Sequence, residues 1–180
     1  MTHCINGYLT DSAIEYLIEP SRTSMIISDI AEPGYWDDTK YDDHINHCIK
    51  EFTNIIKNNP VLVDCMKSSP VIFASGGKMH GDLISLLDSH NITYRCVKPC
   101  DVNYGSSYMP QRNILVWGIH GDLCVLEHAA AIARHSSLTR AIILLDATYN
   151  LYASGHEKTY TLARHTPNID AVSNPVRFVK

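Results

Sequence analysis

The sequence has no CxxC pair, although six cysteines stand among its 180 residues. A ribbon-type zinc site and a thioredoxin-like redox motif both need that spacing, so neither is predicted. The cysteines lie at positions 4, 48, 65, 96, 100 and 124. We expect most of them to be free thiols that fill the core.

Long apolar runs and a basic excess are also missing. No stretch approaches the roughly 20 apolar residues of a membrane span, and "MTHCINGYLTDSAIEYL" lacks the basic start and apolar stretch of a secretory signal. The net charge is -4, with scattered Lys and Arg, which argues against nucleic acid. We therefore expect a cytoplasmic protein, forming a homo-oligomer, that acts on a small molecule with no cofactor, nucleic acid or membrane partner.

Strand-like and helix-like segments alternate along the chain, which predicts parallel strands joined by helical crossovers. The expected fold is α/β: a single three-layer α/β/α domain over residues 1–180, with a mostly parallel, doubly wound sheet of about six strands. Residues 1–22 are expected to form an N-terminal extension, an added helix or an oligomer contact. Strands are expected at 23–31, 70–75, 92–97, 112–118, 140–147 and near 171–174, and helices at 44–58, 82–90, from 124 onward and at 156–165.

Three chemically reactive residues follow predicted strands. Asp29, Lys98 and Cys124 come at or just after the carboxyl ends of the first, third and fourth strands. Ligands of open parallel sheets bind at that edge. Each residue taken alone has a simpler explanation: a turn carboxylate, a surface charge and a small buried thiol. Their expected placement on one edge favours a functional site.

The chemistry that suits these residues is nucleophilic. A thiol at a helix start beside a cation gains thiolate character, and a carboxylate such as Asp29 can take its proton and return it to a leaving amine. Backbone N–H groups in the turn before Cys124 can hold an oxyanion, at about 3 kcal/mol per donor.

The segment "ILVWGIHGDLCVLEHAAAIARHSSLTRAIILLDATYN" resembles the signature region of the isochorismatase-like cysteine hydrolases, which include nicotinamidases and N-carbamoyl amidases. Gly118, Cys124, Val125, Asp146 and Ala147 match that region in order and spacing. "MIISDI" similarly resembles the family's first strand, and "RCVKP" its lysine strand.

This resemblance implies specific roles. Cys124 would be the nucleophile, Asp29 the general base and then acid, and Lys98 the group that orients both. It also implies a non-proline cis peptide at Ile119-His120. The backbone amides of His120 and Cys124 would then form the oxyanion hole.

The sequence departs from the family around the expected pocket. Ala31 and Gly34 stand where Gln and Phe are common, and the loop "PCDVNYGSSYMPQR" replaces the usual helix after the lysine. We therefore expect a pocket unlike that of well-known members. Its expected substrate contacts are Tyr35, Trp36, Tyr104 and Gly121.

No metal site is expected. The Asp and two His residues that follow the second strand in nicotinamidases are replaced by "GGKMHGD". His44, His47 and Cys48 share one helical stretch and could ligate zinc, but such a stretch is more often just a polar face. His120 and His128 bracket the nucleophile and either contact substrate or are solvated.

The leading hypothesis is a hydrolase that cleaves a C–N bond of a small amide, carbamoyl or imide substrate through a Cys124 thioester. The alternative is a catalytically silent isochorismatase-like relative that acts as a binding or assembly module. Asp29 and Cys124 favour the hydrolase, whereas the altered lysine loop favours the silent relative. A redox role for Cys96 and Cys100 ranks third, because their spacing is not that of a known redox pair.

Overall fold

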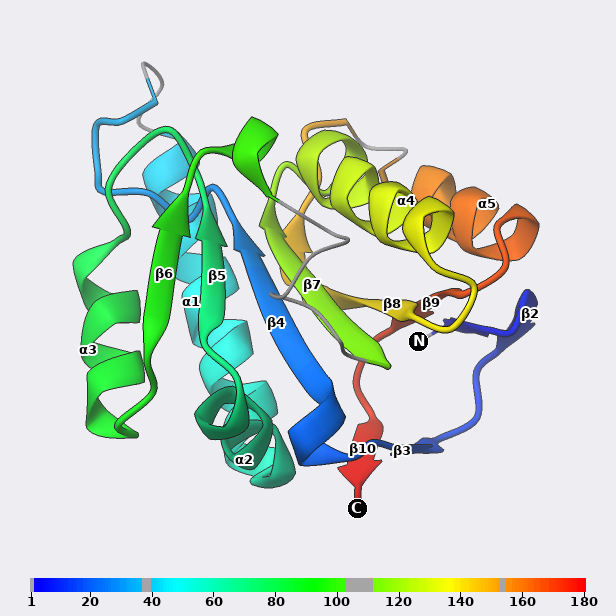
Figure 1. Cartoon of the computed structure of the whole chain (residues 1–180). Helices are drawn as coiled ribbons and strands as arrows, with labels where there is room; N and C mark the ends of the chain where they lie inside the picture. Colours follow the sequence, from blue (N-terminus) through cyan, green and yellow to red (C-terminus); the bar gives the residue numbers. More distant parts are fainter. Residues whose placement is uncertain (1, 37–39, 103–111, 153–154) are drawn as a thin grey trace.

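The fold is a mixed α/β structure around one large sheet (Figure 1). The computed structural model describes residues 2–36, 40–102, 112–152 and 155–180. The sheet has the order β2-β1-β9-β8-β7-β4-β5-β6, and all pairings from β9 to β6 are parallel. The mostly parallel α/β sheet predicted from the sequence is confirmed. Its strands are β1 (His3–Ile5), β2 (Tyr8–Thr10), β4 (Thr23–Ser28), β5 (Val71–Ala74), β6 (Tyr94–Val97), β7 (Asn113–Ile119), β8 (Arg140–Tyr149) and β9 (Ile169–Val172).

Two helical layers cover the sheet. Every residue of β4 is buried, and alternate residues serve different cores because successive side chains of a strand point to opposite faces. Met25 and Ile27 belong to the core that includes α1, α2 and α3, whereas Ile26 belongs to the core that includes α4 and α5. This arrangement produces the three layers. The helices are α1 (Lys40–Asn58), α2 (Val61–Ser68), α3 (Gly81–Ser89), α4 (Leu126–His135) and α5 (Gly155–His165).

The N-terminal segment differs from the prediction of an added helix. It forms β1 and β2, which extend the sheet in antiparallel fashion beyond β9. It also forms β3 (Ile14–Leu17), which pairs in parallel with β10 (Val176–Val179) as a separate two-stranded sheet. These strands have three or four residues each, too few for a period to stand out in the sequence.

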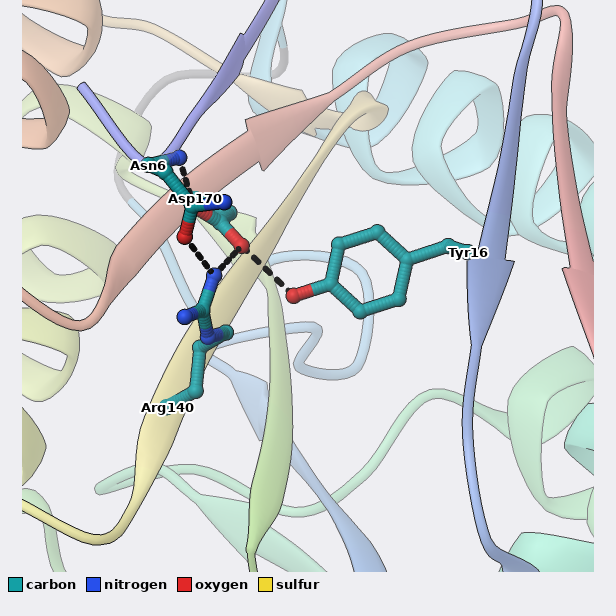
Figure 2. Close-up of polar contacts among 4 residues, drawn as sticks. All are labelled: Asn6, Tyr16, Arg140 and Asp170. Atoms are coloured by element: carbon teal, nitrogen blue, oxygen red, sulfur yellow. Dashed lines mark hydrogen bonds and ion pairs between the residues drawn. The ribbon is translucent and has the colours of Figure 1, made fainter. Parts of the chain in front are cut away.

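A buried polar cluster fastens this segment to the sheet (Figure 2). Asp170 on β9 is fully buried and accepts hydrogen bonds from the Tyr16 hydroxyl at 2.5 Å and from the Asn6 backbone N–H at 2.9 Å. The Arg140 guanidinium donates to the same carboxylate at 2.6 Å and to the Asn6 side chain at 2.6 Å. The buried charge of Asp170 is therefore paired by groups from β3, β8 and the β1–β2 turn.

We expect Tyr16→Phe to lower the free energy of unfolding by about 2 kcal/mol, because it removes one hydrogen bond to a buried charge. Urea denaturation followed by circular dichroism measures the change. Tyr8→Phe is the matched control, since Tyr8 is 78% exposed on β2. Equal denaturation midpoints for the two variants would show that the Tyr16 hydroxyl does not stabilise this attachment.

Gly118 shapes the end of β7 beside the candidate site. It pairs with Ser28 on β4 and has φ +127, a conformation that side-chain-bearing residues rarely adopt. A Cβ at this position would lie 2.0 Å from the Ser28 carbonyl oxygen. Glycine therefore lets the end of β7 approach the end of β4, which brings the two following turns together.

Candidate functional site

Asp29 occupies the turn directly after β4. Its backbone has φ +55, in the left-handed region that Asp and Asn tolerate better than most residues. Its N–H donates to the Ala74 carbonyl on β5 at 3.0 Å. The side chain is buried, with the residue 4% exposed, at the carboxyl edge of the sheet.

Three hydrogen-bond donors at this edge of the sheet reach the Asp29 carboxylate. They are the Ser75 hydroxyl, the Cys124 thiol and the Ser28 hydroxyl, the last at 3.4 Å. Burial raises the pKa of Asp29 above its usual range, while these hydrogen bonds and the nearby His120 lower it in part. The result is a carboxyl group that binds a proton more readily than an exposed aspartate.

Cys124 lies in the π-helical turn Gly121–Val125 that leads into α4. Its sulfur accepts a hydrogen bond from the His120 backbone N–H, and its thiol is hydrogen-bonded to Asp29. Burial and then the charge of Asp29 raise the pKa of Cys124 to about 11. The expected thiolate character is therefore wrong for the resting protein: the close charged neighbour is an anion, so the thiol keeps its proton at neutral pH.

The structure does not bring Lys98 to these two residues. Lys98 follows β6, which is separated from β4 by β5, so its backbone starts about 10 Å from the Asp29 strand. It is exposed, and no hydrogen bond or ion pair between described residues joins it to Asp29 or Cys124. The lysine that the resemblance assigned to the site is therefore not in contact with either residue.

His120 lies at the junction of the strand and the turn. The Ile119-His120 peptide is cis, as the resemblance implied. The residue is 7% exposed, and its ring centroid lies 5.2 Å from that of Trp36 and 5.1 Å from that of Tyr41. Burial lowers the pKa of His120, with Asp29 among the opposing charges, so its imidazole is mostly neutral at pH 7.

His128 is also buried, on α4, and burial lowers its pKa to about 4. The interpretation of His120 and His128 as solvated histidines is therefore wrong. Both side chains lie in the protein interior near the turn that carries Cys124. A contact with substrate stays a prediction for both.

Aromatic side chains cluster around His120, whose charged form acts on Asp29. The Tyr35 ring lies against the Gly76-Gly77 backbone, where a Cβ on Gly77 would come within 2.6 Å of the ring. Its centroid is 5.0 Å from that of Trp36, which in turn lies 5.6 Å from that of Tyr41. Tyr35 and Trp36 thus lie in one cluster, and their role with substrate stays a prediction.

Tyr104 and Gly121 were also expected to contact substrate. Tyr104 lies outside the described residues. Gly121 is packed so closely that a Cβ would lie 2.4 Å from Thr148 Cγ2 and from Asn150 Oδ1, which gives it a packing reason to be glycine. The neighbouring Asp122 accepts hydrogen bonds from the backbone N–H groups of residues 151 and 152 at 2.9 and 3.1 Å, which fixes the loop after β8 against this turn.

Ser75 and Tyr41 were not among the site residues predicted from the sequence. Ser75 ends the predicted strand "PVIFAS" at the same sheet edge as Asp29, so the topological rule could have found it. Tyr41 stands at the start of α1, and its sequence position gives no sign that its ring contacts a residue about eighty positions later.

Candidate metal ligands are not grouped in the described part of the chain. No cluster of three or more His, Cys, Asp or Glu side chains suited to a metal occurs there. The three residues of α1 that could ligate zinc do not come together. The centroid of the His44 ring lies 3.6 Å from that of Tyr149, with the rings stacked, while His47 is exposed and Cys48 is buried in the core. The expected absence of a metal stays a prediction.

None of the helices in the described ranges has the length and hydropathy needed to cross a membrane.

No family model and no curated protein matches the sequence, but solved structures resemble the chain, among them a nicotinamidase and a cysteine hydrolase. The nicotinamidase SaPncA from Staphylococcus aureus aligns with TM-score 0.53 and 12% identity over 78% of this chain and 93% of its own. A cysteine hydrolase from Pseudomonas syringae pv. phaseolicola 1448A aligns with TM-score 0.51 and 13% identity over 91% and 94%.

The chain therefore shares the fold of these two hydrolases, a large, mostly parallel sheet with helices on its faces, which is consistent with the isochorismatase-like fold. This likeness establishes the fold alone.

Proposed function

We propose that the chain is a hydrolase that cleaves a C–N bond of a small amide, carbamoyl or imide substrate through a thioester at Cys124. The observation that carries the proposal is the hydrogen bond between the Cys124 thiol and the buried Asp29 carboxylate. A nucleophile and a base in direct contact form the minimal unit of covalent acyl transfer. The two hydrolases that share the fold support this class of chemistry.

In the first half of the proposed reaction, Asp29 accepts the thiol proton as the sulfur of Cys124 attacks the substrate carbonyl carbon. The negative charge that develops on the carbonyl oxygen is held by the backbone N–H groups of Cys124 and His120, the latter exchanging its resting contact with the Cys124 sulfur for the oxyanion. The C–N bond then breaks, and the leaving nitrogen takes the proton from Asp29. The raised pKa of the Asp29 carboxyl group suits this alternation between base and acid.

In the second half, a water molecule attacks the thioester carbon while Asp29 takes one of its protons. The C–S bond breaks, the acid product leaves, and the sulfur regains its proton from Asp29. Protons and electron pairs therefore balance over the cycle without a redox cofactor, and the protein returns to the hydrogen-bonded thiol and carboxylate pair seen in the structure.

A second candidate is a catalytically silent relative that binds a ligand or a partner at the same sheet edge. The exposed Lys98, which contacts neither Asp29 nor Cys124, favours it. The two candidates differ in one observable, because only the hydrolase forms a covalent bond to its substrate.

Intact-protein mass spectrometry after incubation with small amides, N-carbamoyl amino acids and cyclic imides, quenched with acid, tests the hydrolase. We expect one compound to give an acyl adduct that peptide mapping assigns to Cys124, with release of its amine or ammonia. Cys124→Ala should form no adduct. Adducts on the exposed Cys96 or Cys100 instead, or binding without any adduct or product, would contradict the proposal.

A further inference from the structure

Ser75 directly follows β5, and both its backbone and its side chain are hydrogen-bonded. Its backbone N–H donates to the Val97 carbonyl on β6 at 3.0 Å. Its Oγ accepts a hydrogen bond from the Gly77 N–H at 3.1 Å, and its hydroxyl donates to the Asp29 carboxylate. The residue is only 7% exposed. The hydroxyl is therefore fixed by backbone groups before any ligand arrives.

The direction of the Ser75 proton follows from these contacts. A serine hydroxyl has one proton to donate and two acceptor lone pairs. The Gly77 N–H occupies one lone pair, and the single proton goes to Asp29. Ser75 and Asp29 directly follow Ala74 and Ser28, which are register partners of β5 and β4, so the two residues meet at the same sheet edge. The Ser75 hydrogen bond favours the ionised form of Asp29 and lowers its pKa.

We propose that Ser75 is the positioning residue for Asp29, in the orienting role that the family resemblance had assigned to Lys98. The inference rests on the proposed function, because Asp29 is the base of that reaction. A neutral hydroxyl orients the carboxylate without adding a positive charge to the site. This agrees with a Cys124 thiol that stays protonated until Asp29 accepts its proton.

Other titratable groups near Asp29 also influence its pKa. The titratable side chains among the main influences on its pKa are Cys124, from the π-helical turn, and His120, which directly follows β7. Asp122 faces His120, and Glu127 on α4 acts on Cys124. Replacement of Ser75 leaves all four of these groups in place, so its effect on Asp29 can be measured separately.

The test compares Ser75→Ala with Ser75→Thr, which keeps a hydroxyl, and with Ser28→Ala, which removes the other serine hydroxyl, 3.4 Å from the Asp29 carboxylate. Proteins labelled with ¹³C at aspartate carboxyl groups are titrated by NMR, and the Asp29 signal is assigned by its loss in Asp29→Asn. The pH dependence of kcat/KM is measured in parallel with the compound that acylates Cys124, and thermal unfolding is recorded for each variant.

We expect Ser75→Ala to raise the titration midpoint of Asp29 by about one pH unit, because a hydrogen bond to the ionised form is lost. The acid limb of kcat/KM should move upward by the same amount, with about a tenfold lower rate below it. Ser75→Thr should restore both, and Ser28→Ala should shift them less.

A purely structural serine would lower the melting temperature and leave both the midpoint and the acid limb unchanged, which would overturn the inference. A raised midpoint without a shifted acid limb would also overturn it, since Ser75 would then act on Asp29 without serving the reaction. Failure of the proposed function has a different signature: Asp29→Asn would itself retain turnover, whatever Ser75→Ala does to the midpoint.

Discussion

We expect Cys124→Ala to lower kcat/KM by about 10⁴-fold or more, because removal of a covalent nucleophile leaves only binding and the backbone donors to assist the reaction. The loss should come with a small change in stability, since Cys124 is only partly buried and belongs to neither hydrophobic core. Steady-state hydrolysis of the compound that acylates the protein, together with urea denaturation, measures both quantities.

Cys100→Ala is the matched control for this variant. Cys100 is an exposed free thiol in the turn after β6, at the same edge of the sheet. We expect it to keep wild-type turnover. If Cys124→Ala hydrolyses the compound at a normal rate, the thioester mechanism is wrong. If the wild-type protein hydrolyses none of the compounds, the hypothesis of a catalytically silent relative is favoured.

The second large effect is expected for Asp29→Asn, with a fall in turnover of about 100-fold or more, because an amide cannot accept the Cys124 proton. The protein should still fold. Asn tolerates the φ of +55 at this position as well as Asp does, and its carbonyl oxygen can still accept the Ser75 hydrogen bond. We expect a cost in stability of roughly 1 kcal/mol.

Asp101→Asn provides the comparison for a carboxylate at the same sheet edge. Asp101 is exposed in the short turn after Lys98 and has no contact with Cys124 in the described structure. Its turnover should remain close to that of the wild type. Near-normal turnover of Asp29→Asn would defeat the assignment of Asp29 as general base and leave Cys124 to be activated by another group.

Much of the fold could be predicted from local patterns. The segment "TSMIIS" is apolar throughout, as a strand buried on both faces requires, and it became β4. The alternation of such runs with amphipathic helices was enough to predict the parallel sheet. The short strands β1, β2, β3 and β10 were not predicted, because their stability comes from partners distant in sequence, such as Asp170 for the segment around Asn6 and Tyr16.

The candidate site, too, was predicted from the sequence only in part. Strand ends identified Asp29 and Cys124, because the carboxyl edge of a parallel sheet is fixed by chain direction. The same rule placed Lys98 on that edge but could not say how far its strand lies from β4. The strand order puts β5 between them, and it is Ser75 at the end of β5 that reaches the carboxylate.

The sequence by itself determined the layers, the parallel sheet and the edge on which the reactive residues meet, because hydrophobic periodicity and chain direction are local properties. Only the tertiary structure decided the charge state and the partners of the site. Cys124 keeps its proton because it is partly buried beside a carboxylate rather than a lysine. Such environments depend on which turns a sheet brings within a few ångströms of each other, and that is set by strand order and by close approaches such as the one at Gly118.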